Sequence, residues 1–196
     1  ISSAYANELI ISASGTNSSG ILFSSANTIR PMKNGATSSG TQDLGTSNGQ
    51  WKDLYLSGGV FLGGTGAANK LEDYEEGSFV LTLGRVGADA FGVGRYVKVG
   101  SLVHFQWYSG GAINVDGGAG GASFSGLPFT NNGGGTNAYS TFSTSHNTYC
   151  PTAVTGYISA NGTSGTFTAL NSTSAAPVNA SSGRYLMLAG TYSTAQ

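Results

Sequence analysis

Apolar residues in the first third of the chain form short bursts that are separated by small polar residues. The bursts have the sequences ELII, ILF, DLYL and VFL, and the Gly, Ser and Asn residues between them favour turns. Strands this short carry few apolar side chains, and burial at about 25 cal/mol per Å² does not offset the entropy of ordering so glycine-rich a segment. We therefore expect residues 1–66 to form a β shaft in which several copies of the chain intertwine.

Beyond residue 77 the pattern changes to the period of two that is typical of strands. The segment SFVLTLGRV places Phe79, Leu81 and Leu83 on one face. The segments TAVTGYIS, GTFTAL and GRYLMLAGTY are further strand candidates, and turn-forming residues separate them. Regular short strands without a helical period predict an all-β fold, with an antiparallel, jelly-roll-like β-sandwich head over residues 78–196.

One hairpin is predicted with particular detail. GRYVKVGSLVHFQWY has a tight turn at residues 100–101, and the strand that leaves it alternates apolar with polar residues. Phe105 and Trp107 lie on its apolar face, and we expect them, with Phe129, to belong to the core rather than to a ligand platform. His104 lies on the polar face and is expected to be an ordinary hydrogen-bonding surface residue.

Charge is scarce in this chain. Only 9% of its residues are charged, the formal net charge is −1, and the 8 basic residues are dispersed. Without a basic stripe to neutralise phosphates, we expect no nucleic-acid partner. No run of 18 apolar residues is present, so we expect no membrane insertion. The chain begins with Ile1 rather than Met, which predicts the C-terminal part of a longer protein or a processed product.

Carboxylates are concentrated in residues 67–77, at the boundary between the two patterns. Glu72, Asp73, Glu75 and Glu76 are four of the nine acidic residues. The segment NKLEDYEEG could form one or two helical turns between an Asn cap and a Gly stop. A catalytic pair, a metal site and a structural junction are the alternatives for these carboxylates.

The junction is the interpretation that the sequence favours. Glycoside hydrolysis needs two acids facing one sugar, and past Asp89 the head contains only Asp116. Three copies of the cluster could supply oxygen ligands to Ca²⁺, but the spacing matches no calcium loop. We therefore expect no catalytic residue, no cofactor and no metal, with the four junction carboxylates as weak metal candidates.

Part of the sequence resembles the distal region of bacteriophage tail fibres. The resemblance is carried by WKDLYLSGGVFLGGTGAANKLEDYEEGSFVLTL, then GRYVKVGSLVHF and SGLPF, with a shaft-like segment, ANELIISASGTNSSGILFSS, upstream. It implies a homotrimeric, receptor-binding fibre of the virion, assembled in the host cytoplasm, attached to the rest of the tail and contacting the host surface. A depolymerising spike, a structural virion fibre and a bacterial surface adhesin are the alternatives.

The head loops are rich in Gly, Ser, Thr, Asn and aromatic residues, a composition that suits adaptable binding surfaces. Such loops fit neutral sugars, which need donors, acceptors and aromatic platforms, although a surface protein is also a possible receptor. The residues predicted to contact the receptor are Tyr139, His146, Asn147, Tyr149, Asp116 and Asn132.

A nucleophilic pair of Cys150 and His146 is the remaining chemical alternative. The two residues are close in sequence, but no residue can be named that would orient the histidine or stabilise an oxyanion. We expect Cys150 to be a small buried apolar residue instead.

Overall fold

The computed structural model describes residues 8–66, 69–71, 73–86, 92–117, 120–132 and 138–195. The chain divides into two compact units, Ile1–Tyr55 and Leu56–Gln196. Among the described residues there is no α-helix and the regular structure is almost entirely β-strand, which confirms the predicted all-β class. Accordingly, the described part of the chain contains no helix with the length and apolar character needed to cross a membrane.

The first unit contains one antiparallel sheet in the order β1-β2-β3-β4. Its strands are β1 (Leu9–Ser12), β2 (Ser19–Ser24), β3 (Thr28–Lys33) and β4 (Ala36–Thr37). One face of this sheet buries a cluster of only three residues, Ile10, Leu22 and Met32. A core this small agrees with the expectation that one copy of the segment buries little apolar surface.

The opposite face of the same sheet is apolar and exposed. In register, Leu9 lies opposite Phe23, and Phe23 lies opposite Ile29. A second row consists of Ile11, Ile21 and Pro31. These isoleucines, Leu9 and Phe23 keep 40% to 69% of their surface accessible. The sheet is therefore apolar on both faces, and within the described part of the first unit one of these faces stays largely exposed.

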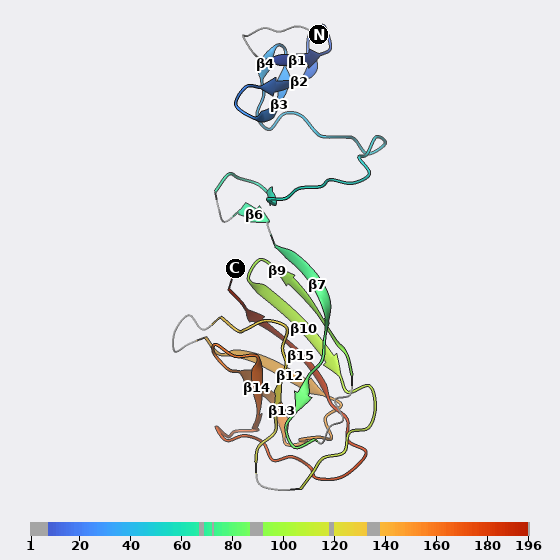
Figure 1. Ribbon diagram of the computed structural model, residues 1–196, viewed down its shortest axis with the longest axis vertical. Coiled ribbons are helices and arrows are strands. Elements are labelled where there is room, and N and C mark those ends of the chain that lie inside the picture. Colours follow the sequence, from blue (N-terminus) through green and yellow to red (C-terminus); the bar gives the residue numbers. More distant parts are fainter. Residues whose placement is uncertain are drawn as a thin grey trace. The chain divides into compact units, whose positions relative to one another are not determined.

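The second unit is built on one antiparallel sheet of nine strands (Figure 1). The strand order is β7-β9-β10-β15-β12-β13-β14-β11-β8, and the sheet curls strongly into a half-barrel. The strands are β7 (Tyr74–Phe79), β8 (Thr82–Leu83), β9 (Gly94–Val99), β10 (Leu102–Tyr108), β11 (Ser123–Ser125), β12 (Ser140–Ser145), β13 (Ala153–Ile158), β14 (Ser164–Ala169) and β15 (Met187–Ser193). A small separate ladder pairs β5 (Val60–Phe61) with β6 (Lys70–Leu71). All nine head strands thus belong to a single hydrogen-bonded sheet, where the sequence analysis expects a sandwich.

The two edges of the curled sheet are formed by one continuous piece of chain. Strand β7 lies at one edge and β8 at the other, and only Val80 and Leu81 separate them in sequence. Leu81 is 1% exposed, between the buried side chains of Phe79 and Leu83. The predicted alternation in this segment is therefore confirmed, and it carries the chain from one edge of the sheet to the other.

Strand glycines lie beneath aromatic rings inside the curl. A Cβ atom at Gly94 would lie 2.5 Å from the Phe79 ring, and one at Gly165 would lie 2.5 Å from the Phe124 ring. The same relation holds for three further pairs: Gly77 with Tyr96, Gly156 with Phe142, and Gly190 with Phe105. The rings contact one another edge-on, with Phe124, Phe142 and Phe167 at centroid distances of 5.1 to 5.8 Å. Because glycine has no side chain, these inward strand positions leave the space that the rings fill.

The predicted hairpin is confirmed, and one other expectation is wrong. Strands β9 and β10 meet at residues 100–101, and Phe105 and Trp107 are buried. The expected helical turns in NKLEDYEEG are replaced by β6 and β7, because β7 pairs along its whole length with β9. The sequence pattern also does not predict strand β12, because its Ser and Thr residues hide the alternation and Phe142 is its one buried residue.

Replacing Gly190 by Ala is expected to destabilise the head. The new Cβ atom would lie 2.7 Å from Phe105 Cε1 and 2.9 Å from Phe142 Cβ, so two core side chains must move. We expect the free energy of unfolding to fall by about 1 to 3 kcal/mol, measured by chemical denaturation followed by tryptophan fluorescence. Gly111→Ala is the matched control, because nothing lies within 4 Å of that position. Equal stability of the two variants would contradict the packing argument.

Candidate functional site

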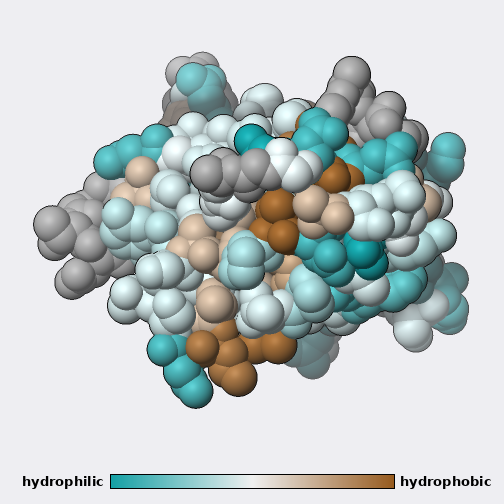
Figure 2. Space-filling model, turned by 90° about the horizontal axis from the view of Figure 1, so that it is seen from below, coloured by the Kyte–Doolittle hydropathy of each residue, from teal (hydrophilic) through white to brown (hydrophobic). Residues whose placement is uncertain are grey.

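The predicted receptor-binding residues lie at opposite ends of the head. One end of the head carries the turn at residues 100–101 and the last residue of β15, because Leu102 pairs with Ser193 there. We call it the turn end. The opposite end, the loop end, carries the segments that follow β8, β10, β12 and β14. Asn132 and Tyr139 lie at the turn end, whereas Asp116, His146, Asn147 and Tyr149 lie at the loop end. Figure 2 shows the head from below, where apolar patches are surrounded by polar residues.

Two of the predicted contact residues have structural roles instead. Tyr149 is fully buried, and its hydroxyl donates a hydrogen bond to the Gly84 carbonyl oxygen at 2.5 Å. The Asn147 amide donates to the carbonyl oxygens of Cys150 and Ala153, at 2.9 and 2.8 Å, and its Oδ1 accepts from the Cys150 amide. Both side chains are used in holding the β12–β13 loop, so they are unavailable to a receptor.

The alternative of a nucleophilic pair between Cys150 and His146 finds no support in the structure. Cys150 is fully buried, as expected, and burial raises the pKa of its thiol to about 12. His146 is exposed and has a φ of 42°, in the left-handed region, which directs its ring to the surface. The buried thiol is therefore a neutral core group.

His146 is the centre of an aromatic stack at the loop end. Its ring lies 4.9 Å from the Tyr185 ring at an interplanar angle of 9° and 5.8 Å from the Tyr108 ring at 26°. The three residues come from the β12–β13 loop, the segment before β15 and the end of β10. The two half-buried tyrosine rings and the exposed imidazole present flat apolar surface beside polar atoms.

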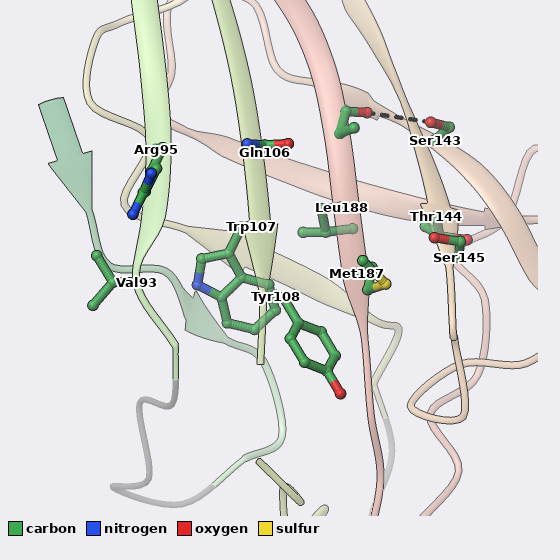
Figure 3. A pocket seen from close by; sticks show the side chains of 11 residues that line it. Val93, Arg95, Gln106, Trp107, Tyr108, Ser143, Thr144, Ser145, Met187 and Leu188 are labelled. Atoms are coloured by element: carbon green, nitrogen blue, oxygen red, sulfur yellow. Dashed lines mark hydrogen bonds between the residues drawn. The ribbon is translucent and has the colours of Figure 1, made fainter. Parts of the chain in front are cut away.

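A groove on the outer face of the sheet begins at the same tyrosine (Figure 3). Its floor consists of two cross-strand rows that follow the register of β9, β10, β15 and β12. The first row is Arg95, Gln106, Ala189 and Ser143, and the second is Val93, Tyr108, Met187 and Ser145. The volume of this hollow is about 280 Å³.

The groove exists because its central residues are small. In the first row the short side chains of Ala189 and Ser143 follow the longer ones of Arg95 and Gln106. In the second row Tyr108 and Met187 are the large side chains beside them. Hydroxyl and amide groups from Ser143, Ser145 and Gln106 provide donors and acceptors, and Tyr108 and Met187 provide apolar surface. Groove and stack share Tyr108, and we call them together the groove–stack surface.

The remaining predicted contact residues are exposed but separated from this surface. Tyr139 is 57% exposed and packs edge-on against Tyr157, with ring centroids 5.4 Å apart. The backbone amide of Asn132 donates to the Ser193 carbonyl oxygen at 2.6 Å. Asp116 lies in the loop after β10, where its amide donates to the Arg85 carbonyl oxygen at 2.8 Å. Of the predicted residues, only His146 belongs to the groove–stack surface.

The described acidic residues at the junction hold the edge strand β7. Asp73 forms an ion pair with Lys98, whose side chain is 6% exposed. The Tyr96 hydroxyl donates to Glu75, and the Tyr74 hydroxyl donates to Glu76 at 3.0 Å. These hydrogen bonds are the main reason that the pKa values of both tyrosines are raised. Glu72 lies outside the described residues, and within the described part no three metal-ligating side chains come together.

Comparison with protein-family models, curated proteins and solved structures finds no match for this chain. The site is therefore defined by its geometry. Sequence reasoning missed Arg95, Tyr108 and Tyr185 as a group, although the hairpin register already predicts that Gln106 and Tyr108 share the polar face. What could not be predicted is the approach of β12 and the loop of Tyr185 to that face.

Raising the pH is expected to destabilise the head through Cys150. Burial raises the thiol pKa from its ordinary value of 9.0 to about 12, so the folded chain keeps a proton that the unfolded chain loses. The contribution of the thiol to the free energy of unfolding is therefore fully present below pH 9. It is lost between pH 9 and 12, at about 1.4 kcal/mol per pH unit for each such group. Buried Tyr192, whose pKa is also raised to about 12, contributes from its ordinary value of 10.0 upward.

Chemical denaturation at a series of pH values measures this dependence. In Cys150→Ala the decline between pH 9 and 10 should become shallower, because the thiol ionises in the unfolded chain from pH 9 whereas tyrosine ionises mainly above pH 10. An unchanged decline in the variant would show that the thiol is not the responsible group. In the native protein the same thiol should resist a water-soluble disulfide reagent until the chain unfolds.

Proposed function

We propose that this chain is the distal part of a bacteriophage tail fibre, a homotrimeric adhesin that attaches the virion to a glycan on the host surface. The observation that carries this proposal is the groove–stack surface on the head. The family attribution rests on the tail-fibre-like segments of the sequence, above all residues 51–77. A host surface protein is the second kind of receptor that such a surface could bind.

The chemistry of the groove–stack surface supports a saccharide as receptor. Sugars present hydroxyl groups that need both donors and acceptors, and they present apolar ring faces that pack on aromatic side chains. Gln106, Ser143 and Ser145 meet the first need, and Tyr108 with the stacked His146 meets the second. All of these groups lie on strands or are fixed by stacking, so little entropy is lost when a ligand binds.

The uncovered apolar face of the first unit supports the trimer. The rows through Phe23 and Ile21 form a contiguous apolar surface, which a monomeric protein rarely leaves in water. Trp51, Leu54 and Tyr55 are also exposed, at 66% to 89%. In an intertwined shaft over residues 1–66, other copies of the same chain would cover this face. The residues after the shaft form the junction and the head.

A second apolar patch, on the head, agrees with this assembly. Tyr74, Val99 and Leu102 lie side by side on three neighbouring strands near the turn end, and Val97 continues the patch. Each of the four keeps 38% to 61% of its surface accessible. Contacts between heads at the turn end would leave the groove near the loop end free, and three weak sites on one particle bind a repetitive surface far more tightly than one.

We propose binding without cleavage. Among the described residues that line the groove none is Asp or Glu, whereas glycoside hydrolysis normally uses two such acids. Glu75 and Glu76 are hydrogen-bonded to tyrosines on β9 and β7, and Asp116 lies in a loop. Incubation with host polysaccharide should therefore release no new reducing ends.

Light scattering of the purified chain should give three times the mass of one chain. A chelator should leave this mass unchanged, and dissociation by chelation would instead place a metal at the acidic junction. Ile29→Glu should dissociate the trimer, because it puts a charge on the exposed apolar row. Thr28→Glu, one residue earlier, is the matched control. A folded monomer in the wild type would contradict the shaft proposal.

The receptor role is tested by competition with phage adsorption. Purified wild-type chain should block attachment of the parent phage to its host. Tyr108→Ala removes the residue shared by groove and stack, and we expect at least about tenfold weaker competition, since three sites amplify the loss. Tyr139→Ala at the turn end is the matched control, because that ring lies outside the groove–stack surface. Failure of the wild type to compete would favour a structural fibre instead.

A further inference from the structure

We propose that the groove recognises a sugar that carries a carboxylate, with Arg95 as the residue that binds the acid. This inference rests on the proposed glycan-binding function and goes beyond it by assigning the chemical class of the ligand. It also departs from the composition of the head, which by itself favours neutral sugars.

Among the described residues that line the groove, Arg95 is the one with a formal charge. It is exposed on the outer face of β9, and within the described part of the chain its guanidinium has no hydrogen bond or ion pair. The other described arginines each donate a side-chain hydrogen bond: Arg30 to Thr28, Arg85 to Gly117 and Arg184 to Asn179. The guanidinium of Arg95 is therefore available to a ligand.

None of the described charged groups near Arg95 forms an ion pair with it. Its neighbour across β7 is Ser78, and on the β10 side it lies opposite Gln106. Glu76, the acid two residues before Ser78, accepts a hydrogen bond from the Tyr74 hydroxyl at 3.0 Å. His104 lies on the same face of β10, hydrogen-bonded to Thr191 at 3.2 Å. A guanidinium without an ion-pair partner, at one end of a groove whose other described lining residues are uncharged, favours an anion at that position.

A carboxylate fits this position better than a phosphate. The planar guanidinium matches a carboxylate with two parallel hydrogen bonds, and the two single charges balance. A phosphate ester carries about −1.5 to −2 charges at neutral pH, and the described lining residues hold no second cation to balance it.

The rest of the groove fits the body of a saccharide. From Arg95 the first row runs across Gln106 and Ala189 to Ser143, which covers three strand spacings, or roughly 14 Å. The small side chains of Ala189 and Ser143 leave room above the sheet, and Tyr108 with Met187 provides an apolar wall. An acidic sugar can therefore place its carboxylate on Arg95 and its ring over the small residues.

NMR of the purified chain tests this assignment with simple probes. D-Glucuronate, D-galacturonate and N-acetylneuraminate would be titrated into the protein, and the methyl ester of each would serve as its neutral partner. The Arg95 Nε–H signal and the backbone amides of Gln106 and Ser143 report on the two ends of the groove. We expect at least one acid to shift all three signals at millimolar concentration and its ester to bind at least about tenfold more weakly.

Arg95→Ala should abolish the difference in affinity between each acid and its ester. Arg95→Lys should retain part of this difference, because it keeps the positive charge but not the planar guanidinium. Arg30→Ala, which removes an equal charge in the first unit, should retain the full difference. Phosphomannan fragments form a further arm, and stronger binding of these than of any carboxylate would overturn the carboxylate assignment.

The outcomes separate this inference from the glycan-binding function. If acids and esters shift Gln106 and Ser143 equally while Arg95 stays unchanged, the carboxylate assignment is overturned and glycan binding stands. If no saccharide shifts any groove signal and the chain also fails to compete with phage adsorption, both proposals are overturned. If the chain competes but no acid shifts Arg95, only the carboxylate assignment is overturned.

Discussion

The head depends on the packing of aromatic rings over glycines that lie on inward strand positions. A sheet that curls into a half-barrel has a narrow interior, and side chains on every inward position would overfill it. Gly156, Gly165 and Gly190 on three strands leave the space that Phe142, Phe124 and Phe105 occupy. The rings then contact one another edge-on, which gives close packing without a second sheet. The close packing of the core therefore depends on these glycines.

Closing the open side of such a sheet is the second requirement, and one piece of chain meets it. The segment from β7 to β8 supplies both edges, with Leu81 buried between them. The acidic residues at its start hold it in place, because Asp73 pairs with the nearly buried Lys98 and Glu75 accepts a hydrogen bond from Tyr96. In a chain with so few charges, this concentration of carboxylates orders an edge strand where it would otherwise fray.

Since the interior provides the stability, the outer face is free to vary. Small residues such as Ala189 and Ser143 cost little there, because they face solvent rather than the core, and the hollow between them is a consequence. The aromatic stack around His146 extends this face to the loop end on positions that packing has fixed. A surface built this way is preorganised, and preorganisation lowers the entropic cost of binding for any ligand that it accepts.

The sequence by itself determined the strand content, the hairpin over residues 94–108 and the inward set Phe79, Leu81 and Leu83, because alternation is a local property of the chain. Only the tertiary structure decided that the strands form one sheet, that β12 lies within it, and that Tyr149 and Asn147 are structural. It also brought Arg95, Tyr108 and Ser143 together from strands distant in sequence. Such neighbours follow from the order of strands in the sheet, which joins residues distant in sequence and which the local alternation of apolar and polar residues does not specify.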